Sequence, residues 1–141
     1  MKRKATAVWR GGLKDGRGSL ATESGVLRDT SYSFGTRFEG SAGTNPEELI
    51  AAAHAGCFAM AFSAELGKAA ITPASITATA TVTLDKTDAG WTVTESHLDV
   101  LVRVPGANAT TVQGIANVAK AGCPISRLLN ARVTMDAKLE G

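Results

Sequence analysis

The chain has 141 residues, of which 44% are hydrophobic and 20% are charged, and its formal net charge is +2. This composition predicts one globular domain over residues 1–141, and so small a net charge does not favour a nucleic-acid partner. The first residues lack the apolar core of a signal peptide, and no segment is expected to reach membrane-spanning length. We therefore expect a cytoplasmic protein that has no membrane partner.

The first half of the chain predicts a β meander followed by one long helix. The expected strands are residues 5–10, 18–23 and 31–38. The helix is expected to begin at Asn45 and Pro46, because asparagine is a favoured N-cap and proline suits the first helical position. Glu48 suits the third position of a capping box. The helix should run to about Lys68, and its nearly uniform apolar character predicts burial on every side.

The second half predicts strands, helices and a final strand. Residues 75–85 alternate between apolar side chains and threonines, which is typical of a half-buried antiparallel strand. The remaining elements are expected at residues 91–104 (strand), 108–120 (helix), 124 onward (short helix) and 132–139 (strand). This order indicates an α+β fold with antiparallel sheets.

The two cysteines are the most informative residues. Cys57 lies within the apolar helix, and Cys123 directly precedes Pro124, where it is expected to cap a short helix and direct its sulfur at unsatisfied backbone N–H groups. That position would stabilise a thiolate. Both cysteines could equally be small buried hydrophobes. A permanent disulfide is disfavoured in the cytoplasm, which leaves core packing, metal binding or redox chemistry.

Five segments resemble the OsmC/Ohr family of thiol-dependent peroxidases, specifically its OsmC branch. They are TESGVL (22–27), TRFEG (36–40), GTNPEELI (43–50), AAHAGCF (52–58) and AKAGCPIS (119–126). The resemblance covers nearly the whole chain, in order. It implies a single OsmC-like domain with antiparallel sheets around a buried central helix, assembled as an intertwined homodimer.

The resemblance also implies an activity and the residues that perform it. The activity is reduction of organic hydroperoxides, and more weakly of hydrogen peroxide, in protection against oxidative stress. Cys57 corresponds to the attacking cysteine and Cys123 to the resolving one, while Arg37 activates Cys57 and Glu47 holds Arg37. The implied reductant is a dithiol such as a dihydrolipoyl group, and neither a cofactor nor a metal is expected.

The chemistry accounts for these residue types. A thiolate attacks the O–O bond, and the resulting sulfenic acid condenses with a second thiol. An apolar helix would raise the pKa of Cys57, and a neighbouring guanidinium would reverse that shift. From the local sequence alone, however, Cys123 is the more reactive thiol, because only Cys123 has a helix N-terminus beside it.

Glu47 and Cys57 are ten positions apart on one predicted helix, about 15 Å along its axis. A carboxylate cannot brace an arginine at so distant a thiol within one helix. Two antiparallel helices that cross near residues 51–53 would bring Glu47 of one subunit beside Cys57 of the other, so we expect a site shared across a two-fold axis.

Other residues have simpler interpretations. His54 shares the helical face of Cys57 but is expected to be a packed helix residue, because the sequence offers no further ligands at zinc-site spacings. Glu48 is interpreted as a cap, and His97 lies in a predicted strand. The alternative function is a redox sensor without turnover, or a ligand-binding module, that uses the same cysteines. We favour the enzyme, because no output domain is expected within this chain.

Overall fold

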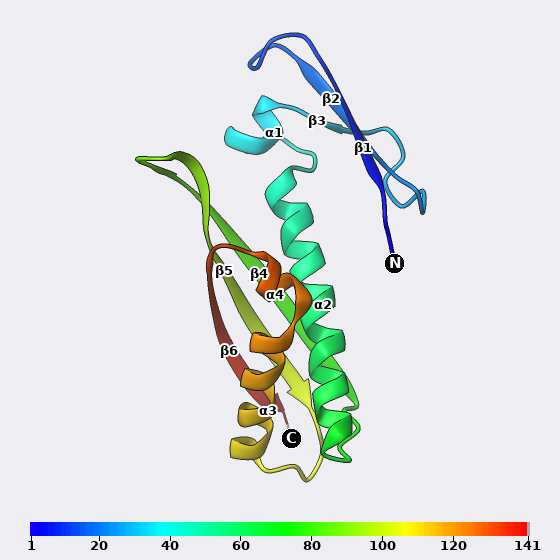
Figure 1. Ribbon diagram of the computed structural model, residues 1–141, viewed down its shortest axis with the longest axis vertical. Helices are drawn as coiled ribbons and strands as arrows, with labels where there is room; N and C mark the ends of the chain where they lie inside the picture. The colour runs from blue at the N-terminus through cyan, green and yellow to red at the C-terminus, as the bar shows by residue number, and fades with distance from the viewer. Residues whose placement is uncertain (141) are drawn as a thin grey trace. The chain divides into compact units, whose positions relative to one another are not determined.

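The computed structural model describes residues 1–140, which form two compact units, one over residues 1–49 and the other from residue 50 onward. Each unit contains an antiparallel pair of strands and helical segments (Figure 1). The predicted α+β class is confirmed. The intertwined homodimer stays a prediction.

The first unit holds a meander of β1 (Ala5–Arg10), β2 (Arg17–Thr22) and β3 (Thr30–Tyr32), in that order and antiparallel. The predicted strand over residues 31–38 is wrong beyond Tyr32, where a short helix, α1 (Phe34–Phe38), begins. The helix α1 begins here because Ser33 and Thr36 form a capping box. Ser33 N donates to Thr36 Oγ1 at 2.9 Å and Thr36 N donates to Ser33 Oγ at 3.2 Å, which satisfies two backbone donors and starts a helical turn.

The long helix α2 (Pro46–Lys68) has the predicted bounds. Asn45 is its cap, because Glu48 N donates to Asn45 Oδ1 at 2.8 Å, while the Glu48 carboxylate accepts from Thr44 Oγ1 at 2.7 Å. By length and composition α2 could cross a membrane, so the expectation that no segment reaches such a length is wrong. Core helices of soluble proteins pass the same test, and one face of α2 does belong to a protein core.

That core face is a narrow stripe, spaced by four residues, made of His54, Phe58, Phe62 and Leu66. A second stripe is exposed and consists mostly of small residues: Ala52, Ala53, Gly56, Met60, Ser63, Ala64 and Gly67. The prediction that the helix is buried on every side is therefore wrong for the single chain. A three-stranded sheet can cover only one side of a helix that lies on it.

The second unit is built on a sheet with the order β4-β5-β6: β4 (Ser75–Thr87), β5 (Gly90–Arg103) and β6 (Arg132–Glu140). β4 and β5 are antiparallel as predicted, but β6 runs parallel to β5. The prediction of purely antiparallel sheets is wrong at this pair. Parallel neighbours need a crossover, and here α3 (Ala109–Gly122) and α4 (Pro124–Leu128) provide it.

The core of the second unit lies between this sheet and its helices (Figure 1). Alternate residues of β5 pack with the buried stripe of α2 and with α3; the members from β5 and α3 are Leu98, Val100, Val102, Val112, Ala116 and Ala119. Because side chains alternate along a strand, His97 and Asp99 of β5 lie on the opposite face of the sheet. The sheet thus has a helix-covered face and an outer face.

Candidate functional site

The second unit brings the two cysteines together. Cys57 is partly buried on α2, and Cys123 is fully buried where α3 ends and α4 begins. Both are free thiols, and they lie within hydrogen-bonding reach of each other. Two thiols separated by 66 positions in the sequence therefore meet in the folded chain, where they are placed to exchange a proton or to form a disulfide.

The surroundings shift the two thiol pKa values in opposite directions. Burial raises the pKa of Cys57, and the backbone of Ile125 opposes this only in part. Burial alone would also raise the pKa of Cys123. The backbone and hydroxyl of Ser126, the Cys57 thiol and the backbone of Ile125 together outweigh it and lower that pKa. Within the chain, Cys123 is thus the more acidic of the two thiols.

Cys123 occupies the predicted N-cap of α4, although its sulfur makes no cap hydrogen bond of standard geometry. The N–H groups of Ile125 and Ser126 act on the sulfur as nearby dipoles, which is sufficient to favour its thiolate. The local expectation that Cys123 is the more acidic thiol agrees with these surroundings.

A buried polar chain leads to Cys123 through Ser126. His54 is fully buried, with Nδ1 at 2.7 Å from Ser96 Oγ and Nε2 at 2.8 Å from Ser126 Oγ. Burial lowers the pKa of His54, so the ring is neutral near pH 7. His54 is the packed residue that the sequence suggested. Its serine partners were not foreseen, because both lie far from it in the sequence.

The first unit brings Arg37 and Glu47 together. Arg37 Nη2 lies 2.6 Å from Glu47 Oε1, and Arg37 Nε lies 3.1 and 3.2 Å from the two carboxylate oxygens. Glu47 is mostly buried, and the guanidinium carbon of Arg37 lies 5.2 Å from the centre of the Phe38 ring. This forked pair fixes the plane of the guanidinium. The proximity of Arg37 to Cys57, which belongs to the other unit, stays a prediction.

A cavity of about 260 Å³ opens beside Arg37 in the first unit. Its lining is mostly aromatic and aliphatic: Trp9, Leu13, Tyr32, Ser33, Phe34, Arg37 and Phe38. Phe58 and Phe62 are fully buried and belong to the core of the second unit instead. The cavity could receive an apolar group beside the guanidinium of Arg37.

One further group of potential ligand atoms is found within residues 1–140, away from the cysteines: His97, Asp99 and Asp136 on the outer face of the second sheet. Its spacing gave no signal in the sequence, because Asp136 comes from a strand that is distant in the chain.

Comparison with known proteins agrees with the resemblance. The family model described as OsmC-like protein matches residues 38–138. Peroxiredoxin OsmC of Escherichia coli (strain K12) is 54% identical over 138 residues, which cover 98% of this chain and 96% of that protein. The organic hydroperoxide resistance protein OhrB of Bacillus subtilis is 30% identical over 87% of this chain and 88% of its own. The crystal structure of OhrB superposes with a TM-score of 0.69 at 26% identity, covering 97% of this chain and 98% of OhrB.

Proposed function

The chain belongs to the OsmC-like protein family, and on this basis we propose that it is a thiol-dependent peroxidase that reduces organic hydroperoxides and, more weakly, hydrogen peroxide. Its role is protection against oxidative stress. The observation that supports this most directly is the proximity of the thiols of Cys57 and Cys123 in the core of the second unit. The relative that is 54% identical to the chain is named a peroxiredoxin.

The proposed reaction has two steps before reduction. The Cys57 thiolate attacks the terminal oxygen of the hydroperoxide and the O–O bond breaks, so that Cys57 becomes a sulfenic acid. The alkoxide takes up the proton that the Cys57 thiol lost on ionisation and leaves as the alcohol. The Cys123 sulfur then attacks the sulfur of that sulfenic acid, which releases water and forms the Cys57–Cys123 disulfide. An external dithiol, such as a dihydrolipoyl group, takes the two oxidising equivalents and restores both thiols.

Arg37 and Glu47 have a defined part in this proposal. Burial raises the pKa of Cys57 within the chain, so the attacking thiolate needs a cation. Arg37 supplies it, and the Glu47 fork holds the guanidinium in one orientation. The aromatic cavity beside Arg37 is suited to the apolar tail of an organic hydroperoxide.

The proposed assembly is a homodimer with sites at the subunit interface. The exposed stripe of α2 is apolar and made mostly of small residues, so two such helices can approach closely. Apart from the adjoining residues and the local backbone of α2, a methyl group added at Gly56 would meet no atom of its own chain within 4 Å. Glu47 and Cys57 are about 15 Å apart along the axis of α2, which favours a Glu47 supplied by the partner.

The proposal treats residues 1–141 as one OsmC-like domain that acts in the cytoplasm, and its peroxidase reaction needs no cofactor, metal, nucleic acid or membrane. The single domain is supported by the match of OhrB over 98% of its solved chain. No observation favours a sensor without turnover over the enzyme.

The test is a peroxide-consumption assay on the full-length protein, with dihydrolipoamide as donor and cumene hydroperoxide compared with hydrogen peroxide. Wild type should consume cumene hydroperoxide faster. Cys57→Ser should be inactive, and Cys123→Ser should react once and leave a sulfenic acid that a dimedone probe labels. Labelling of Cys57→Ser instead would reverse the two roles, which is the assignment that the lowered pKa of Cys123 favours. If the wild type does not turn over peroxide with dihydrolipoamide, the proposed peroxidase activity is wrong.

The same assay tests Arg37. Arg37→Ala should move the rise of activity to higher pH, because Cys57 then loses its cation, and alkaline pH should recover part of the rate. Arg37→Lys keeps the positive charge but loses the forked pairing with Glu47. Its activity should therefore rise at a pH between those of wild type and Arg37→Ala. An unmoved pH profile with a lower rate would mean that Arg37 positions the peroxide.

A further inference from the structure

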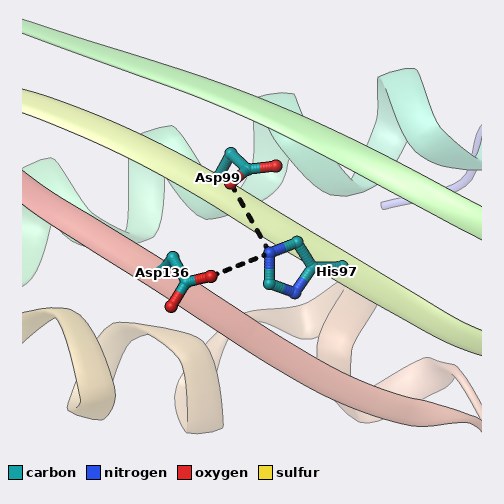
Figure 2. Close-up of side chains that lie close together, drawn as sticks. All are labelled: His97, Asp99 and Asp136. Atoms are coloured by element: carbon teal, nitrogen blue, oxygen red, sulfur yellow. Dashed lines mark ion pairs between the residues drawn. The ribbon is translucent and has the colours of Figure 1, made fainter.

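Three ligand-bearing side chains converge on the outer face of the second sheet (Figure 2). His97 and Asp99 project from β5 and Asp136 from β6. His97 Nε2 lies 3.5 Å from Asp99 Oδ1 and 3.4 Å from Asp136 Oδ2, and the candidate ligand atoms all lie within 4.8 Å of one another. Both carboxylates are exposed to solvent, and His97 is partly buried.

The strand register makes the acid pair unusual. Asp99 of β5 is directly opposite Asp136 of β6, and like charges in such positions destabilise a sheet. The charged rows on either side have opposite signs. Glu95 is opposite Arg132 and Arg103 is opposite Glu140, and each row forms an ion pair.

The nearest basic side chain by register is Lys138, which is opposite Leu101 in the adjoining row. Among the ion pairs of the described residues, none joins Lys138 to either aspartate. The row of Asp99 and Asp136 therefore carries two like charges without an ion pair to Lys138, whereas the rows of Glu95 with Arg132 and of Arg103 with Glu140 are each neutral.

His97 is oriented as a ligand. Its Nδ1 lies 2.6 Å from Thr134 Oγ1, on the strand that also carries Asp136. When Nδ1 carries the proton and donates it to Thr134, the lone pair of Nε2 faces the two carboxylates. Such a hydrogen bond at the other ring nitrogen is the usual way in which a ligating histidine is held.

The separations from His97 Nε2 to the two carboxylates fit a small divalent ion. Two ligands of a tetrahedral zinc ion at bond lengths of about 2.0–2.1 Å are roughly 3.3 Å apart. The separations of 3.4 and 3.5 Å from His97 Nε2 to the carboxylate oxygens are close to that value. One imidazole nitrogen with two carboxylates suits Zn²⁺ better than Mg²⁺ or Ca²⁺, which prefer oxygen ligands alone.

We propose that His97, Asp99 and Asp136 form a binding site for one divalent transition-metal ion of the Zn²⁺ class, with water completing its coordination. The ion neutralises the opposed aspartates and links β6 to β5 across their parallel pairing. The site lies on the face of the sheet opposite the core, and it is independent of the peroxidase chemistry proposed for the cysteines.

The test is a Zn²⁺ titration of the full-length chain by calorimetry, in a Cys57→Ser/Cys123→Ser background because thiols bind zinc themselves. We expect one ion per chain. His97→Gln and Asp136→Asn should each weaken binding by at least about tenfold, since even the loss of a group that only supports a ligand costs that much.

Glu140→Gln is the matched control. It removes the same charge from the same face of β6, but Glu140 is paired with Arg103 at 3.3 Å and should leave zinc binding unchanged. Zinc should also shift the NMR signals of the His97 ring and spare those of the buried His54. Equal binding by the control and the two ligand variants, an unmoved His97 ring, or Mg²⁺ binding as tightly as Zn²⁺ would each overturn the proposal.

Discussion

His54 illustrates how a buried polar residue depends on its partners. The ring is fully buried, yet both nitrogens have serine hydroxyls as partners, at 2.7 and 2.8 Å. In a neutral imidazole one nitrogen donates and the other accepts, and a hydroxyl can take either part. The two serines can therefore satisfy the neutral ring but give it no counter-charge, which is why burial disfavours the imidazolium.

This arrangement predicts acid destabilisation that originates at His54. The pKa of His54 is lowered in the folded chain from its ordinary value of 6.5, so the unfolded chain takes up a proton first as the pH falls. The stabilisation is complete above 6.5 and is lost as the pH falls toward the lower pKa of the folded state. Melting temperatures measured across this range should show the loss in wild type and a smaller loss in His54→Gln. His97→Gln, which changes the partly buried histidine of the second sheet, should leave the pH dependence that originates at His54 in place. Equal slopes in wild type and His54→Gln would contradict the assignment.

Ser126 is predicted to regulate the acidity of Cys123. Its hydroxyl is one of the groups that lower the pKa of that thiol, and it also contacts His54. Ser126→Ala should raise the pKa of Cys123, measured from the ultraviolet absorbance of the thiolate in a Cys57→Ser background. Ser96→Ala is the matched control, because it removes the other hydroxyl partner of His54 but no contact with the sulfur. A shift of equal size in both variants would mean that the effect comes from disturbing His54.

At the scale of elements, α2 has two faces with different roles. The stripe of large residues is buried against the second sheet, and the stripe of small residues is exposed along the same helix. Met60 lies on the second stripe and is 77% exposed, although methionine is a large apolar residue that usually belongs to a core. An apolar helix face left uncovered by its own chain is typical of a protein–protein contact.

The exposed stripe predicts that Gly56→Leu weakens self-association. A larger side chain at Gly56 has room within its own chain, so the subunit should fold normally, and leucine is a better helix former than glycine. Gly114→Leu is the matched control, since Gly114 is also helical, exposed and open around its Cβ position. Sedimentation should show a loss of dimer in the first variant only. An unchanged dimer in Gly56→Leu would exclude this face as the interface.

At the scale of the whole molecule, the proposed dimer predicts complementation between an inactive Cys57→Ser chain and a weakly active Glu47→Ala chain. Cys57→Ser lacks the attacking thiol, and Glu47→Ala lacks the brace for Arg37. Mixing the two should regenerate one complete site in the heterodimer, formed by Cys57 of the second chain and Glu47 of the first. Peroxide consumption after subunit exchange, confirmed by mass spectrometry, measures this. Activity that stays at the contribution of the Glu47→Ala parent would show that each site is built within one chain.

The sequence by itself determined the features that depend on neighbouring residues. Asn45 and Pro46 located the start of α2, because a cap and a fixed φ angle act within one helical turn. The alternating threonines located β4 for the same local reason. The Ser33–Thr36 capping box was equally local but was obscured by the aromatic residues around it, which favour strand.

Only the tertiary structure decided which distant residues meet. The contact between Cys57 and Cys123, the serine partners of His54 and the opposition of Asp99 to Asp136 join segments that no local pattern relates. The parallel direction of β6 likewise follows from the path of α3 and α4 across the sheet. Local propensities act over a few residues, whereas these contacts depend on how the whole chain buries its apolar surface, and that packing is a property of the fold.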